Sequence, residues 1–215
     1  MLILGMGFSG SRLAGRRAME GWRVTDVRRT GEGGAIAFTD EAAVQAAIRN
    51  ATHILSSVPP EGENDPVLVR HGAAIAAAPA IWTGYLSSTG VYGDSGGAWV
   101  DEASPVGQGR RAARIRADLA WGALRADMRR FRLPGIYGPG RSALDRVKEG
   151  KAHRVALRDQ LFSRIHVDDI VSGVIASFDG PPGVYNLADD LPCAQNAVVE
   201  AACDLLGQPW PPLLG

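Results

Sequence analysis

Short apolar runs alternate with longer amphipathic stretches through the first two thirds of the chain. Such runs are typical of strands buried in a parallel sheet, and the stretches between them have the spacing of helices packed on it. The predicted strands cover residues 1–4, 22–27, 35–38, 54–58, 81–87 and 131–133. The predicted helices cover residues 9–20, 40–50 and 66–78, followed by an arginine-rich helix that ends near Arg129. This order predicts an α/β fold with a doubly wound parallel sheet.

After residue 140 the periodicity weakens. Helices are expected over residues 142–150, 168–178 and 195–206, with one short strand over residues 184–187. Two helix starts carry their own signals: Asp40 is expected to be an N-cap, and Pro66 to lie in the first turn of its helix.

The 215 residues include 23 basic and 23 acidic side chains, so the formal net charge is zero. This balance gives no overall basic field for a nucleic acid. The uncharged segment 72–93 contains Pro79 and Gly84, which favour a helix followed by a buried strand over a membrane span. Cys193 and Cys203 are the only cysteines, which fits a reducing compartment, and the N-terminus lacks a signal-peptide pattern. We therefore expect a cytoplasmic protein that binds neither nucleic acid nor membrane.

A glycine-rich turn joins the first predicted strand to the first predicted helix, with the sequence GMGFSG over residues 5–10. In a GxGxxG turn the first glycine permits the tight bend, the second lets the backbone approach a pyrophosphate, and the third lets helix and strand pack closely. The phosphates then meet free amides at a helix N-terminus. The alternative is a glycine turn that only packs. The expected dinucleotide-binding residues are Gly5, Gly7, Phe8, Ser9 and Gly10.

The end of the second predicted strand bears on the choice of dinucleotide. Arg28 and Arg29 follow it, and guanidinium groups suit the 2′-phosphate of NADP. Asp26 leaves NAD open, because an acidic side chain there can bind the ribose hydroxyls. The two arginines can also be a solvated strand end. We expect NADP as the cofactor, with NAD as the alternative. The adenosine side is expected to be lined by Ser57, Val58 and Pro59, which follow the fourth predicted strand.

Further motifs follow the glycine turn. They are LSSTGVYG over residues 86–93 with DEASP over residues 101–105, RLPGIYGPG over residues 132–140, and RIHVDD over residues 164–169. Together they resemble the extended and atypical branches of the short-chain dehydrogenase/reductase superfamily, which are epimerase/dehydratase-like. The resemblance implies an NAD(P)-binding Rossmann fold and an oxidoreductase or epimerase/dehydratase acting on a sugar nucleotide or a similar polar small molecule. It also implies that Pro134 lies beside the nicotinamide.

The family's catalytic unit is a serine or threonine, a tyrosine that acts as acid and base, and a lysine four residues after the tyrosine. Ser88 matches the serine, but no YxxxK occurs in the sequence. Counting back from the segment 118–121, which resembles the family's active-site helix, Arg110 replaces the tyrosine and Arg114 the lysine. Arginine keeps its proton near neutral pH, so Arg110 cannot carry out the proton transfer. Arg114 can still bind the nicotinamide ribose, or it can lie on a solvated helix face.

The catalytic candidates are Ser88, Tyr92 and Tyr137, because the resemblance places both tyrosines near the substrate pocket. Each tyrosine can instead pack and hydrogen-bond locally. Two functional classes therefore stay open. One is an NADP-dependent oxidoreductase or epimerase that uses Ser88 and a relocated acid, and the other is a catalytically weak or inactive NADP(H)-binding sensor or scaffold.

The resemblance divides the chain into a Rossmann core over residues 1–140 and a reduced substrate-side region over residues 141–215, packed together as a single structural unit. The small second region leaves the pocket open or completed by a partner subunit, so a homodimer is one expectation. His166 beside Asp168 and Asp169 lacks the spacing of metal ligands, and helix capping accounts for the two aspartates. We expect no metal site.

Overall fold

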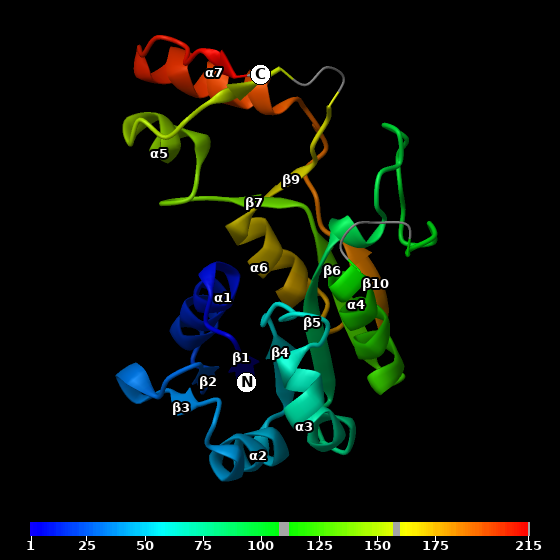
Figure 1. Ribbon diagram of the computed structural model, residues 1–215. Helices are drawn as coiled ribbons and strands as arrows, with labels where there is room; N and C mark the ends of the chain where they lie inside the picture. The colour runs from blue at the N-terminus through cyan, green and yellow to red at the C-terminus, as the bar shows by residue number, and fades with distance from the viewer. Residues whose placement is uncertain (108–111, 157–159, 215) are drawn as a thin grey trace.

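The computed structural model describes residues 1–107, 112–156 and 160–214. Its centre is a seven-stranded sheet with the order β10-β6-β5-β4-β1-β2-β3, in which all neighbouring strands are parallel (Figure 1). The strands are β1 (Leu2–Leu4), β2 (Thr25–Arg28), β3 (Ile36–Ala37), β4 (His53–Ser56), β5 (Trp82–Ser88), β6 (Met128–Leu133) and β10 (Gly183–Asn186). The chain runs outward from β1 in one direction and then from β4 in the other, which is a doubly wound Rossmann sheet. The predicted fold class is confirmed.

Helices cover both faces of this sheet. The helices α1 (Phe8–Met19) and α6 (Val167–Ala176) lie on one face, and α2 (Glu41–Asn50), α3 (Pro66–Ala76) and α4 (Ala112–Leu124) lie on the other (Figure 1). Successive strand residues point to opposite faces. Ile3 and Leu55 therefore pack with α1 and α6, whereas Leu4 and Ile54 pack with the other three helices. Strands buried on both faces are why the sequence shows apolar runs rather than alternation.

Two expected helix starts are confirmed. The carboxylate of Asp40 accepts a hydrogen bond from the amide of Ala43 at the start of α2, and Pro66 is the first residue of α3. The N-cap of α3 is Asp65, whose Oδ1 accepts from the amides of the second and third helical residues. Within the described ranges, no helix has the length and apolar character needed to cross a lipid bilayer.

The prediction of an arginine-rich helix reaching Arg129 was wrong. Helix α4 ends at Leu124, and strand β6 begins at Met128, so Arg129, Arg130 and Arg132 are strand residues. All three arginines have acceptors inside the fold. Arg129 donates to the carbonyl of residue 180, and the other two arginines bind one buried carboxylate on α4.

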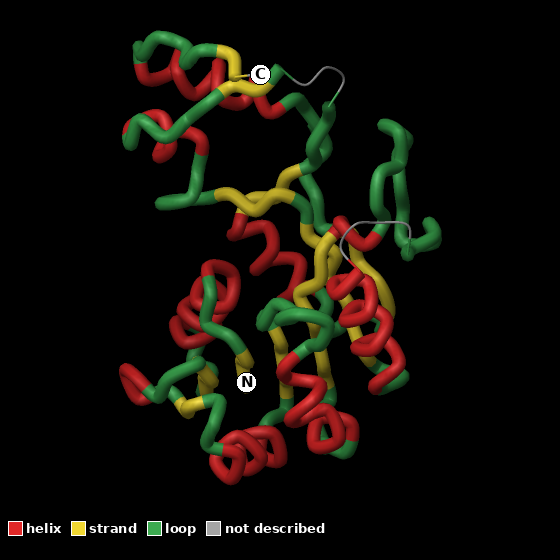
Figure 2. The backbone as a smooth tube through the Cα atoms, viewed as in Figure 1, coloured by secondary structure: helices red, strands yellow, loops and turns green. Residues whose placement is uncertain are grey.

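A small unit stands beyond the carboxyl ends of the central strands. It holds two short parallel strand pairs, seen above the central sheet in Figure 2, which the sequence did not predict. Residues after 140 also supply β10 to the sheet and α6 to one face, and the division at residue 140 stays a prediction. The remaining elements are η1 (Glu32–Gly34), η2 (Thr89–Val91), β7 (Gly135–Tyr137), α5 (Ala143–Lys148), β8 (Arg154–Val155), β9 (Arg164–His166), α7 (Gln195–Leu206) and β11 (Leu213–Leu214).

Candidate nucleotide-binding and active site

The carboxyl ends of β1, β4, β5 and β6 meet along one edge of the sheet. The order reverses between β1 and β4, and open parallel sheets bind their ligands in the crevice at such a point. The glycine turn follows β1, and residues 57–59 follow β4. Ser88 ends β5 and is paired in register with Leu133 of β6, so Ser88 and Pro134 lie at neighbouring positions on this edge.

The glycine turn has two glycines that the fold requires and one that it does not. Gly5 has a φ of +92°, and a Cβ on it would lie 2.9 Å from Val58 Cγ2. A Cβ on Gly10 would lie 2.5 Å from the carbonyl oxygen of Gly5, which is far inside contact distance. A Cβ on Gly7 would meet no atom within 4 Å among the described residues. The space over Gly7 is therefore open, at the position where a GxGxxG turn receives a pyrophosphate.

The loop after β4 holds this turn in place. Ser57 Oγ donates a hydrogen bond to the Gly5 carbonyl at 2.5 Å, and the Ser57 amide donates to Leu4 at 2.8 Å. Ser57 and Val58 thus contact the glycine turn, while Pro59 is exposed beside them. Gly7 is the N-cap of α1 and has no side chain to cap it, so the amides of the first turn are free to meet an anion.

At the end of β2 the structure brings together the acid and one of the two arginines. Arg28 Nε lies 2.7 Å from Asp26 Oδ2, so these two charges offset each other. Arg29 is exposed, and no carboxylate of the described residues lies within ion-pair distance of it. Its guanidinium is therefore the one at this strand end whose charge is available to a phosphate.

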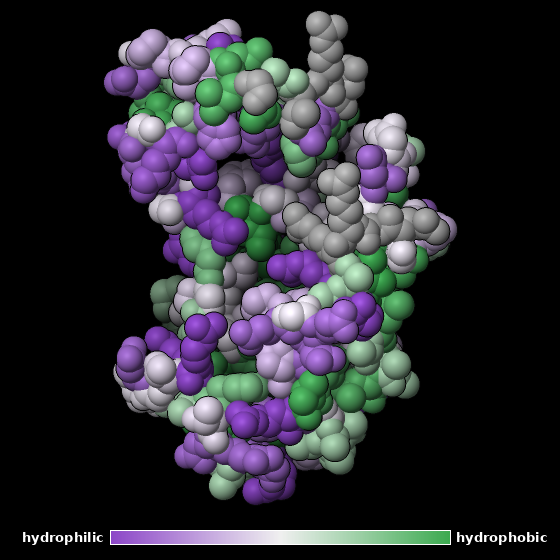
Figure 3. Space-filling model, viewed as in Figure 1, coloured by the Kyte–Doolittle hydropathy of each residue, from purple (hydrophilic) through white to green (hydrophobic). Residues whose placement is uncertain are grey.

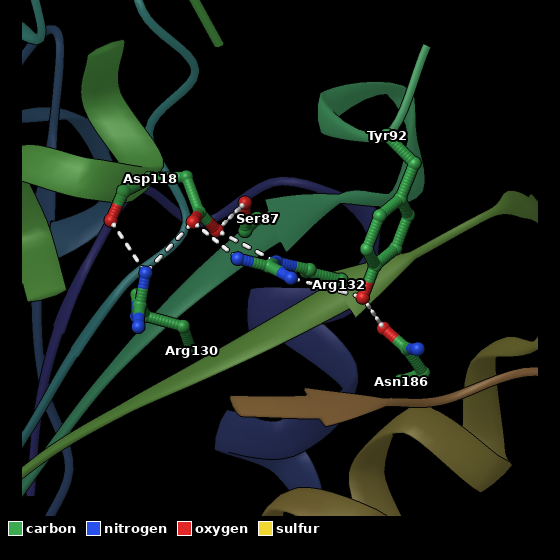
Figure 4. Close-up of polar contacts among 6 residues, drawn as sticks. All are labelled: Ser87, Tyr92, Asp118, Arg130, Arg132 and Asn186. Carbon is green, nitrogen blue, oxygen red and sulfur yellow. Dashed lines mark hydrogen bonds and ion pairs between the residues drawn. The ribbon is translucent and has the colours of Figure 1, made fainter. Parts of the chain in front are cut away.

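A buried polar cluster lies behind the ends of β5 and β6 (Figure 4). Asp118 of α4 is completely buried and accepts a hydrogen bond from Ser87 Oγ at 2.7 Å. Arg130 Nη1 and Arg132 Nη2 each lie 2.8 Å from Asp118 Oδ2. Burial favours the protonated acid, but hydrogen bonds from Arg132 and Ser87 and the two guanidinium charges outweigh it, so the pKa of Asp118 lies below its usual range.

Tyr92 belongs to this cluster. Its hydroxyl accepts a hydrogen bond from Arg132 Nη1 at 2.9 Å and donates one to Asn186 Oδ1 at 2.7 Å (Figure 4). Its side chain is buried, and the Arg132 guanidinium lies 4.9 Å from the ring centroid. Ser88 caps the adjacent η2 turn, where its Oγ accepts from the amide of Gly90 at 3.1 Å.

Tyr137, the other tyrosine candidate, is 36% exposed on β7. Its hydroxyl donates to Asp189 Oδ2 at 3.3 Å, and the other oxygen of this carboxylate accepts from the Arg164 amide at 3.1 Å. The ring contacts His166 edge-on, with 5.2 Å between centroids. Burial and the charge of Asp189 both raise the pKa of the Tyr137 hydroxyl above its usual range, so it is protonated at neutral pH.

A cavity of about 650 Å³ opens beside Tyr137, between β7, α5, α7 and the segment 189–195. Figure 3 shows the surface hollowed in this place. Arg141, Arg146, His153 and Arg164 all line it. The Arg164 guanidinium donates to the carbonyls of residues 162 and 193 and to the side-chain amide of residue 195, with no carboxylate partner among the described residues. Three carboxylates, those of Asp145, Glu149 and Asp189, line the same cavity. The positive charge that it offers an anionic ligand is therefore the local charge of the Arg164 guanidinium rather than a net charge of the lining.

The sequence placed two arginines near the active site. Arg114 is half-buried on α4, and Arg110 lies outside the described residues. At the start of α6 the cap is His166, whose Nδ1 accepts from the Asp168 amide at 3.3 Å, so the expectation that the aspartates cap this helix was wrong. Sequence reasoning missed Arg141, Arg146 and Asp189, because they come from loops and a short helix without a motif. The signals that pointed to this cavity were the motifs RLPGIYGPG, which contains Tyr137, and RIHVDD, which contains Arg164.

No protein-family model matches the chain, and no curated protein matches it. Several solved structures do match the chain. A functionally unknown conserved protein from Silicibacter pomeroyi is 36% identical, with a TM-score of 0.85, over 99% of this chain and 80% of that one.

Two enzymes solved with NAD share the fold at lower identity. The dTDP-glucose 4,6-dehydratase of Bacillus anthracis has a TM-score of 0.78 and 17% identity, covering 99% of this chain and 83% of the enzyme. The UDP-glucose 4-epimerase of Thermus thermophilus has a TM-score of 0.76 and 18% identity, covering 100% of this chain and 86% of the enzyme. The chain thus has the fold of these two enzymes, and it belongs to the same family as the conserved protein of Silicibacter pomeroyi.

Proposed function

We propose that this protein binds NADP(H) at the glycine turn and acts as an oxidoreductase or epimerase/dehydratase on a sugar nucleotide or a similar polar, anionic substrate. The observation that carries the proposal is the open space over Gly7, in a turn whose other glycines, Gly5 and Gly10, are closely packed. The two enzymes that share the fold were solved with NAD, and their names give nucleotide sugars as substrates.

In this proposal the amides of Phe8 and Ser9 hold the pyrophosphate. Arg29 binds the 2′-phosphate and favours NADP over NAD. Arg28 instead engages Asp26, so that this carboxylate is not free for a ribose. The adenosine side is formed by Ser57, Val58 and Pro59, and the nicotinamide side by Pro134 and Arg114.

The bound cofactor would supply or accept a hydride, and the protein's own residues would orient the substrate and move the proton. The guanidinium of Arg164 suits an anionic group of the substrate, such as a phosphate. Ser88 would orient the reacting hydroxyl or carbonyl. Tyr137 would donate the proton, since it faces the cavity and is protonated at neutral pH.

The test uses purified protein, NADPH and NADP, and a panel of UDP- and dTDP-sugars and small carbonyl compounds. Turnover should appear in the wild type and fall at least tenfold in Ser88→Ala and in Tyr137→Phe. Tyr185→Phe is the matched control. Tyr185 lies on strand β10, its hydroxyl donates to the carbonyl of Pro181, and it belongs to neither site. Robust turnover that is indifferent to both substitutions would contradict the assignment of these residues.

NADPH binding without turnover on any compound of the panel would instead support the sensor or scaffold. The cytoplasmic location and the homodimer stay predictions.

A further inference from the structure

We propose that Tyr92 is a positioning residue rather than the proton donor. Its hydroxyl couples Arg132 to Asn186 and thereby fixes the spacing of the three segments that carry the candidate active site. This inference rests on the proposed function for its kinetic consequence, but its structural content can be tested separately.

The coupling begins at a rigid anchor. Asp118 holds Arg132 through Nε at 3.3 Å and Nη2 at 2.8 Å, so the plane of the guanidinium is fixed. Its remaining nitrogen, Nη1, donates to Tyr92. Both charged side chains are almost fully buried, and removing one partner of such a pair is strongly destabilising. The tyrosine hydroxyl is thus bound to a group that cannot readily move.

Each of the three hydrogen-bonded residues, Tyr92, Arg132 and Asn186, lies a few residues along the sequence from a candidate site residue. Tyr92 follows Ser88 by four residues, Arg132 precedes Pro134 by two, and Asn186 precedes Asp189 by three. These short distances along the backbone mean that a shift in one member moves the neighbouring site residue.

Backbone contacts tighten the same region. The amide of Leu187 donates to the carbonyl of Arg132 at 3.3 Å, and the amide of Asn186 donates to Glu102 Oε1 at 2.7 Å. The segment that follows β10 carries Asp189, which holds both Tyr137 and the Arg164 backbone. The network therefore reaches from α4 to the residue that orients the exposed tyrosine.

The same contacts argue against proton donation by Tyr92. Its hydroxyl donates to Asn186 at 2.7 Å and accepts from Arg132, and the side chain is only 7% exposed. The Tyr137 hydroxyl also donates, but over 3.3 Å and from a side chain that is 36% exposed. Its ring packs with Val91 and Ile115. To protonate a substrate it would have to leave both partners and its packed position.

The experiment is a double-mutant cycle with Tyr92→Phe, Asn186→Ala and the pair together. Tyr92→Phe removes only the hydroxyl, and Asn186→Ala removes its acceptor while leaving Tyr92 able to donate to a substrate. Each single substitution should lower kcat on the order of tenfold, from the net value of one to two hydrogen bonds. The kcat of the double variant should be no lower than that of either single variant. Asn186→Asp, which keeps an acceptor, should recover most of the rate.

Two further readouts separate positioning from chemistry. The pH dependence of kcat should be the same in Tyr92→Phe as in the wild type, and amide hydrogen exchange over residues 87–93 and 186–191 should quicken at least tenfold in both single variants. Tyr185→Phe should leave both readouts unchanged. Three results would overturn the inference. The pH profile of kcat could lose one limb in Tyr92→Phe, the losses in kcat of the two single variants could multiply in the double variant, or amide hydrogen exchange could stay unchanged in both single variants. If the wild type shows no turnover, the proposed function fails, and the exchange measurement alone decides on the positioning role.

Discussion

Replacing Asp118 by Asn tests how much of the fold depends on the buried polar cluster. The substitution keeps the shape of the side chain and removes its charge. Arg130 and Arg132 then share a neutral acceptor, although Arg132 is almost completely buried and has no other carboxylate within ion-pair distance among the described residues.

The size of the effect follows from these contacts. Removing one partner of a buried ion pair costs about 3–5 kcal/mol, and the lower end applies here because the amide oxygen of Asn still accepts one hydrogen bond. We therefore expect a loss of about 3 kcal/mol in the free energy of unfolding. With a urea dependence of roughly 3 kcal/mol per molar for a chain of this size, the unfolding midpoint should fall by about 1 M.

The assay is urea unfolding at pH 7, followed by circular dichroism and tryptophan fluorescence. Glu149→Gln is the control, since Glu149 pairs with Lys151 at the surface and such pairs contribute at most about 1 kcal/mol. The folded pKa of Asp118 is lowered, so its contribution is fully present above the unfolded value of about 4 and is lost as the pH falls through the folded pKa. A midpoint for Asp118→Asn within 0.2 M (roughly 0.6 kcal/mol) of the control would refute this reasoning.

Three further outcomes are expected. Gly7→Val should abolish NADPH binding and leave the melting temperature of the free protein nearly unchanged. Gly10→Ala should instead destabilise the fold by about 1–3 kcal/mol, because its Cβ would lie 2.5 Å from a carbonyl oxygen. Thermal melts with and without NADPH check both outcomes. Arg29→Ala should weaken NADPH binding by about 1.5–3 kcal/mol in calorimetric titration and leave NADH binding unchanged. Burial lowers the pKa of His53 to about 4, so the unfolded chain binds this proton first and stability falls as the pH drops from about 6.5 to 4; His53→Phe should remove about 3 kcal/mol of that fall in urea unfolding at the two pH values.

The sequence predicted those parts of the fold that depend on local pattern. A sequence signal within a few neighbouring residues marks the glycine turn, the strands of the sheet and helix starts such as Asp40. Only residues 131–133 of strand β6 were predicted. Arg129 and Arg130 were missed because their acceptors are distant in the chain, at residue 180 for Arg129 and on α4, twelve residues earlier, for Arg130. Burial of arginine in a strand is decided by such a partner and not by the residues beside it.

The candidate site divides in the same way. Ser88 and the residues of the turn could be named from motifs, but the cavity is lined by side chains such as Arg146 and Asp189 that only the folded chain brings together. The sequence could not separate Tyr92 from Tyr137, since both lie in similar aromatic-glycine motifs. Their surroundings differ: one hydroxyl is bound inside a buried network and the other faces the cavity.

The most direct test of nucleotide binding at the glycine turn is a crystal structure of the protein soaked with NADPH. The pyrophosphate should lie over Gly7 against the amides of Phe8 and Ser9, the 2′-phosphate beside Arg29, and the nicotinamide next to Pro134 and within reach of Ser88. Density for the pyrophosphate at any other place, or none at a concentration that saturates other NADPH-binding proteins, would contradict the proposal.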